Sequence, residues 1–465
     1  MAMTLKNPFA TAAATGVTVA AAVILLMIED PRAPYILIAG AAFAWLGLVL
    51  VRRPFACLCL TILFVTLPPI PGPEELRSLS SHLVVLLAFG SFVLAAVHRR
   101  DFVMNPTAVW VGLYLVVAVI TLLWAPDTAA GITKIGSYIV GLMIVVLVSN
   151  QVRDLPSLDS FIRLLGAIGW FFVVAGLYTA FFGTYTFGQR LHVLDMNENT
   201  FGMTLLLLLP GALWPALRAS GKRRSFWTGV GLVYLCCTML LIVLSGSRGS
   251  LISLLVTCLV MLALKPLRPW GLAAVVIVLV SAALTPIYLN LIEARFELAE
   301  GGALGGRGVL WKAALMLIRD HFWMGVGVGN GQFELRTYLA SLTSYYNLRT
   351  DLPAHNPLLE VGSETGVLGI LVYAMIPLSA IWQFAKSSAA LRQRLPSIAF
   401  YTPLVGAVAV GYSISWGKSG GVEATSLTFI MLSLLIIPTR LQSLAERQVL
   451  GETPASLARP FLSTA

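Results

Sequence analysis

Long apolar runs recur along almost the whole chain, and they limit the possible folds more than any other feature. Runs of roughly 17–25 apolar residues, long enough to cross a bilayer as helices, extend from Thr11 to Pro438. Hydrophobic residues make up 58% of the chain and charged residues only 11%, whereas soluble domains carry about 25% charged residues. Because a helix satisfies its own backbone hydrogen bonds in lipid, the sequence predicts an all-α polytopic membrane protein.

The lengths of these runs predict about 12 to 14 transmembrane helices. Their centres lie near residues 20, 43, 62, 89, 115, 140, 170, 208, 235, 256, 280, 371, 406 and 430. We expect the first run, about Ala10 to Ile28, to be a retained helix, because Lys6 is its one basic flanking residue and no small-residue cleavage site follows. With an even number of helices and a cytoplasmic N-terminus, most arginine-rich loops fall inside, as the positive-inside rule requires.

One long loop interrupts the predicted membrane helices and divides the chain into three parts. We expect a transmembrane bundle over residues 1–291, an outer loop over residues 292–356, and C-terminal transmembrane helices with a cytoplasmic tail over residues 357–465. Helical spacing of apolar residues predicts one short helix in the loop sequence WKAALMLIRDHF and a second from about Gln332 to Tyr346. Their aromatic residues suit the headgroup zone of a membrane.

Basic residues remain on the outer side although the positive-inside rule disfavours them there. The net charge is +10 and no soluble basic domain carries it, so we expect no nucleic-acid partner. The short outer loops carry Arg32, Arg77, Lys134, Arg190, Arg248 and Lys418, and the long loop carries Arg295, Arg307, Lys312, Arg319, Arg336 and Arg349. This charge favours an anionic ligand, but pairing with the outer acidic residues explains it equally well.

Four outer stretches share a pattern in which a polar or glycine-rich loop leads into a helix start with a basic residue at the junction. They are GQRLHVLDMNENTFG with Arg190, SGSRGSLI with Arg248, GGRGVLWKAA with Arg307, and AHNPLLE with His355. Arginine presents a planar fork to phosphate oxygens, and helix N-termini add backbone N–H donors. Loop anchoring or headgroup contact explains each arginine alone; together they favour pyrophosphate binding without a metal.

His355 lies immediately before a predicted helix, which Asn356 can cap and whose first turn suits Pro357. Glu360 and Glu364 lie one helical turn apart in the first turns of that helix. They could orient His355 or an arginine, or simply complement the helix dipole.

The remaining polar residues predict structural roles. Asn197 and Asn199 precede a membrane helix and are expected to cap it, and we expect His192 and His321 to be structural. The outer carboxylates are scattered and all 5 cysteines fall inside apolar runs, so we expect no metal site, no disulfide framework and no cofactor.

The quoted motifs, with GGRGVLWKAALMLIRDHFWMGVGVGNGQFE and HNPLLEVGSETGVLGILVY, resemble those of the O-antigen ligase and O-antigen polymerase superfamily of bacterial inner-membrane glycosyltransferases. The resemblance covers roughly residues 185–375 and implies a GT-C-like membrane fold whose long loop is periplasmic. It departs from the family at Phe322, where the usual block has a proline after the histidine. The missing proline is expected to alter that turn without touching a catalytic group.

The resemblance also implies an activity and roles for individual residues. It implies transfer of a glycan from an undecaprenyl-pyrophosphate carrier, at the periplasmic face and among membrane lipids, to a sugar hydroxyl of the lipid A-core oligosaccharide. Arg190 and Arg307 match arginines expected to hold the pyrophosphate, Arg248 is a third contact, and His355 matches the expected catalytic histidine. A near-neutral histidine suits deprotonation of the attacking hydroxyl, although it could instead only bind the acceptor or the phosphate. Direct attack predicts inversion at the sugar carbon.

Other functions fit parts of the same pattern. Within the superfamily, the alternative is the O-antigen polymerase, followed by a protein O-oligosaccharyltransferase, which usually has additional C-terminal sequence. A lipid-linked oligosaccharide transporter belongs to another class and would place its arginines in a central cavity through the membrane. The predicted charge lies on one face instead, which favours an enzyme.

Overall fold

The described part of the protein is built from α-helices. The computed structural model describes residues 53–67, 89–90, 93, 102–183, 185, 190–283, 307–342, 353–419 and 425–449. Its helices are α3 (Pro54–Thr66), α5 (Pro106–Thr121), α6 (Thr128–Gln151), α7 (Leu155–Phe182), α8 (Glu198–Arg218), α9 (Lys222–Ser245), α10 (Arg248–Ala263), α11 (Arg268–Ala283), α13 (Arg307–Asp320), α14 (Gly331–Leu342), α15 (Pro357–Arg394), α16 (Tyr401–Ser419) and α17 (Thr425–Val449), with 3-10 turns at Lys265–Leu267 and Pro396–Ile398. The all-α prediction is confirmed.

Several of these helices are long and apolar enough to cross a membrane. Within the described ranges, six pass by length and composition, namely α6, α7, α8, α9, α15 and residues Thr425–Gln442 of α17. Helix α10 passes only together with Lys265–Val280, from which it is bent by 111°. The protein is therefore a multi-pass membrane protein, as predicted.

The expected centres from residue 115 onward, and the one near residue 62, each fall on or at the end of a helix. Those near residues 20 and 43 lie outside the described residues, and around residue 89 only a few residues are described. The total of about 12 to 14 crossings therefore stays a prediction, as do the domain boundaries.

Polar side chains mark where the helices begin. Asn105 accepts a hydrogen bond from the backbone of Thr107 at the start of α5, and Asp127 does the same for α6. Asp154 forms a capping box with Ser157 at the start of α7. Such caps satisfy N–H groups that have no partner within the helix, and they fix the helix starts inside an otherwise apolar chain.

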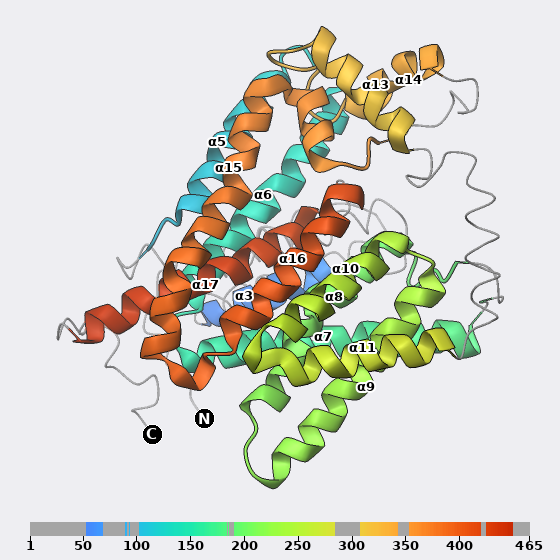
Figure 1. The fold of residues 1–465 in the computed structure, drawn as a ribbon. Helices are drawn as coiled ribbons and strands as arrows, with labels where there is room; N and C mark the ends of the chain where they lie inside the picture. The colour runs from blue at the N-terminus through green and yellow to red at the C-terminus, as the bar shows by residue number, and fades with distance from the viewer. Residues whose placement is uncertain are drawn as a thin grey trace, which may run out of the picture.

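The helices form two connected groups (Figure 1). Helix α15 runs along α5 and α17, and α17 also packs on α6. In the second group, α8 packs on α7, α9 and α16. Helix α16 also packs on α10. Buried apolar residues join the two groups in one continuous core.

Helices α13 and α14 lie together at one end of α5, α6 and α15 (Figure 1). They share a small core of their own, which includes Leu310, Leu317, Leu335, Leu339 and Ala354. The first short loop helix was expected from the apolar spacing and is confirmed. The second begins at Gly331, close to the predicted Gln332, and is described as far as Leu342; its expected end near Tyr346 lies outside the described residues.

Helix α15 is broken at Gly366, and the break is filled by another segment. Gly366 has φ +67°, which no right-handed helix accommodates. The turn after α13 pairs with the broken helix, because Val326 N–H donates to Ser363 O at 3.0 Å and Gly327 N–H to Glu364 O at 2.9 Å. In return, Val367 N–H donates to Phe322 O at 2.8 Å. The backbone groups freed by the break are thus satisfied from outside the helix.

The missing proline at Phe322 does not disturb this pairing, because the residue contributes its carbonyl oxygen and not its N–H group. Gly325, three residues later, also has a positive φ of +66°, and a Cβ there would lie 2.3 Å from the carbonyl carbon of Glu364. The turn and the break therefore approach each other backbone to backbone.

We predict that Gly366→Ala destabilises the protein by about 2 kcal/mol or more, because a left-handed residue with a Cβ costs roughly 1–2 kcal/mol and the added carbon meets packed backbone. That carbon would lie 2.3 Å from the carbonyl carbon of Trp323. Thermal unfolding in detergent measures the effect.

The matched control is Gly136→Ala within α6, where an added Cβ meets no atom within 4 Å. It should leave stability unchanged or raise it by up to about 1 kcal/mol, since glycine weakens a helix interior. Equal unfolding temperatures for the two variants would contradict the described break.

Candidate active site

The structure brings the basic residues of the four sequence motifs to one place. Arg190 lies in the segment before α8, Arg248 and Arg307 are the first residues of α10 and α13, and His355 lies two residues before α15. Burial first, and then the charges of Arg248 and Arg190, lower the pKa of Arg307. Burial and then Arg307 lower the pKa of His355. Arg190, Arg248 and His355 therefore each lie close enough to Arg307 to interact with it electrostatically.

A fourth cation joins the three arginines from α16. Burial and then the charges of Arg307 and Arg248 lower the pKa of Lys418, near the end of that helix. The side-chain amide of Asn356 donates to Gly417 O at 2.9 Å, which fixes the end of α16 beside the start of α15. We refer to Arg190, Arg248, Arg307 and Lys418 as the cation cluster.

Hydrogen bonds on both sides hold His355 in place. The indole N–H of Trp311 donates to Ala354 O at 3.1 Å. Asn356 caps α15, as predicted, by accepting from the N–H groups of Leu358 and Leu359 at 3.0 and 3.1 Å. His355 itself has φ +53°, a conformation that is costly outside glycine and that is found at functional sites when the surroundings enforce it.

Glu198 is a site residue that the sequence analysis missed. It is buried in the first turn of α8, where its carboxylate contacts Arg190 Nη1 at 3.2 Å and His192 Nε2 at 3.3 Å. In sequence, an acidic residue in the first turn of a helix is usually explained by the helix dipole. Nothing in the sequence therefore indicated a further role for Glu198. In the structure it fixes the arginine, and His192 contacts it from the exposed side.

A hydrogen-bond network joins the first turn of α8 to the start of α10. Ser247 Oγ donates to Asn199 Oδ1 at 2.7 Å, and Ser250 Oγ donates to Asn199 O at 3.3 Å. Asn197 caps α8, as predicted. The capping role expected for Asn199 is wrong, because that residue lies inside α8 and links it to α10 instead.

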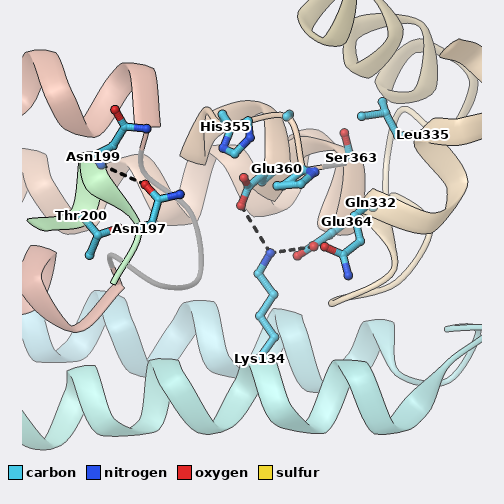
Figure 2. A pocket seen from close by; sticks show the side chains of 13 residues that line it. Lys134, Asn197, Asn199, Thr200, Gln332, Leu335, His355, Glu360, Ser363 and Glu364 are labelled. Carbon is cyan, nitrogen blue, oxygen red and sulfur yellow. Dashed lines mark hydrogen bonds and ion pairs between the residues drawn. The ribbon is translucent and has the colours of Figure 1, made fainter. Parts of the chain in front are cut away.

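Lys134 lies elsewhere than the sequence indicated. It was expected in a short outer loop, but it belongs to α6 and is buried with a side chain only 8% exposed. Its Nζ lies 2.7 Å from Glu364 Oε1 and 3.7 Å from Glu360 Oε2 (Figure 2). The two glutamates therefore pair with a lysine and not with an arginine, and whether they orient His355 stays a prediction.

A cavity of about 170 Å³ lies beside His355, on the same side as the buried ion pair. Its lining includes Asn197, Gln332, His355, Glu360, Ser363 and Glu364 (Figure 2). These residues come from the segment before α8 and from α14 and α15, which are far apart in the sequence. The cavity wall is thus rich in amide, hydroxyl and carboxylate groups.

The arrangement has two chemical sides. The cation cluster and the helix starts at Arg248 and Arg307 can hold a polyanion, while the cavity beyond His355 presents hydrogen-bonding groups without further arginines. Within the described residues, no group of three His, Cys, Asp or Glu side chains could hold a metal ion. Whether transfer needs a metal is tested by adding the chelator EDTA to the assay.

We predict that Lys134→Met lowers the free energy of unfolding by about 3–5 kcal/mol, because it leaves buried carboxylates without their cation. The triple variant Lys134→Met/Glu360→Gln/Glu364→Gln should recover most of that loss. Thermal unfolding in detergent is the measurement, with Lys312→Met on the exposed face of α13 as the control. Similar unfolding of the Lys134 and Lys312 variants would contradict a buried ion pair.

Comparison with known proteins agrees with this geometry. Residues 232–374 match the family described as O-antigen ligase. The matched segment contains Arg248, Arg307 and His355, and it ends in α15 beyond the break at Gly366. No curated protein matches the chain. This match, over residues 232–374, supports membership of the O-antigen ligase and polymerase superfamily and a glycosyltransferase-like function in a membrane.

Proposed function

We propose that the protein is an O-antigen ligase of the bacterial inner membrane. It transfers a glycan from undecaprenyl pyrophosphate to the lipid A-core oligosaccharide, with its site at the periplasmic face. The observation that carries this proposal is that Arg307 interacts both with Arg190 and Arg248 and with His355, whose pKa it helps to lower.

The cation cluster suits the leaving group of such a reaction. When the bond between the anomeric carbon and the phosphate oxygen breaks, the electron pair stays on the pyrophosphate, whose negative charge increases. Arginine forks and the N-termini of α10 and α13 stabilise that charge where it develops. The Arg190–Glu198 contact at 3.2 Å holds one fork in position before the donor arrives.

His355 suits the role of general base. Burial and Arg307 lower its pKa, so at neutral pH the imidazole is neutral and able to accept a proton. The acceptor hydroxyl oxygen forms the new bond to the anomeric carbon while its proton passes to His355. Because the acceptor attacks opposite the leaving group, we expect inversion of configuration, which linkage analysis of a defined product tests.

We predict that His355→Ala lowers kcat by about 100- to 10,000-fold, the usual contribution of a general base. Arg307→Ala should cost about 100- to 1,000-fold through lost stabilisation of the leaving group. Transfer by the purified protein from undecaprenyl-pyrophosphate glycan to lipid A-core, in detergent with EDTA, is the measurement.

The matched controls are His321→Ala and Arg319→Ala, which remove the same side-chain types from exposed positions on and after α13. Both should keep wild-type rates. Longer carrier-linked chains, without transfer to the core, would make the protein a polymerase. If neither product forms, the result favours the transporter. Loss of transfer with EDTA would show a metal requirement.

We also predict that the acid limb of the kcat/KM profile has its midpoint below pH 6.5, the ordinary value for histidine. The sign follows because a lowered pKa keeps His355 neutral down to lower pH. In Arg307→Gln the midpoint should rise, since one cause of the lowering is removed, whereas Arg319→Gln should leave it in place. A wild-type midpoint above pH 6.5 would argue against His355 as the base.

A further inference from the structure

We propose that the cavity beside His355, between α14 and the first turns of α15, is the subsite for the acceptor sugar. A neutral pyranose binds there, with hydroxyl groups that hydrogen-bond to Gln332, Glu360 and Glu364. The inference rests on the proposed glycosyl transfer and assigns a place to its second substrate.

The charges around His355 separate the two substrates. Arg307 acts on His355, and Arg307 and Arg248 act on Lys418, so the proposed pyrophosphate site lies on the side of the cation cluster. The cavity instead contains two carboxylates with Lys134 as their one partner of opposite charge. This wall therefore offers phosphate no arginine, and its carboxylate oxygens can accept hydrogen bonds from hydroxyl groups.

The glutamates retain capacity for a ligand. Each uses one oxygen toward Lys134, Glu364 through Oε1 and Glu360 through Oε2. The other oxygens, Glu360 Oε1 and Glu364 Oε2, are buried and have no hydrogen-bond partner in the described structure. Both side chains are nine-tenths buried or more. A buried acceptor without a donor is costly, and small rotations of these side chains would let sugar hydroxyls supply the missing hydrogen bonds.

The dimensions and the location of the cavity agree with one sugar ring. Its volume of about 170 Å³ is much more than a single water needs. Its lining combines three amides, two carboxylates and two hydroxyls with apolar side chains, and such polar groups orient a bound polar ligand. Because His355 forms part of the same wall, a sugar bound there lies beside the imidazole proposed as the base.

The test compares two cavity variants with a matched control. Gln332→Ala removes a half-buried amide from the wall, and Glu360→Gln keeps the shape while removing a charge. The control is Glu334→Gln, which lies on the same helix as Gln332 but does not line the cavity.

In the transfer assay, Gln332→Ala should raise the KM for lipid A-core about 3- to 10-fold, as expected for one lost neutral hydrogen bond. Glu360→Gln should raise it about 10-fold or more, because that hydrogen bond involves a charged group. The KM for the undecaprenyl-pyrophosphate donor should change less than about twofold in both, since the cation cluster is intact. Glu334→Gln should match the wild type in both constants.

A second measurement does not depend on catalysis. Soluble core oligosaccharide is titrated into His355→Ala protein in detergent, with and without Gln332→Ala, and the heat of binding is recorded. The second substitution should weaken binding by the same factor as it raises KM. Thermal unfolding confirms that each variant is folded, and Gln332→Ala keeps the test informative if Glu360→Gln does not fold.

Unchanged acceptor KM and unchanged oligosaccharide affinity in folded Gln332→Ala would overturn the subsite, as would an effect on donor KM alone. Failure of the proposed function gives a different result, namely no transfer to core by the wild-type protein. If the wild type extends carrier-linked chains instead, the same KM comparison is made with the carrier-linked glycan as acceptor. A selective rise in its KM would then support the subsite, and no rise would reject it.

Discussion

The site depends on the backbone pairing between the break in α15 and the turn after α13. Three hydrogen bonds join them, from Val326, Gly327 and Val367. This pairing fixes the C-terminal end of α13 against the first turns of α15. Since Arg307 begins α13 and His355 precedes α15, the same pairing limits the distance between an anion-binding residue and the candidate base. A rigid scaffold of this kind allows a site built from loop ends to keep its geometry.

Basic groups lie on one side of His355 and acidic groups on the other, so the two sides suit different substrates. Arg190 lies in the segment before α8, and Arg248 and Arg307 begin α10 and α13, whereas the acidic wall comes from α15 and pairs with Lys134 of α6. A buried ion pair of this kind is weak evidence for stability, because desolvation offsets much of its attraction. Its position beside the cavity therefore favours a binding role for the carboxylates.

The helices and the residues at their starts were largely predictable from sequence. Apolar length predicted the membrane helices, and Asn356 and Pro357 predicted the start of α15 through local backbone chemistry. Lys134 was misplaced because its surroundings ITKIGSY contain enough polar residues to read as a loop. Glu198 was overlooked because its partner, Arg190, lies eight residues earlier in a segment without regular periodicity.

The sequence by itself determined the fold class, the family resemblance and the basic residues at the helix starts, because these depend on hydropathy and on short local patterns. Only the tertiary structure decided that Lys418 joins the arginines, that Lys134 neutralises glutamates 226 and 230 positions later, and that a polar cavity adjoins His355. Such contacts join residues distant along the chain, and no local periodicity encodes them. They arise when α6, α14, α15 and α16 pack and bring otherwise separate charges within a few ångströms of one another.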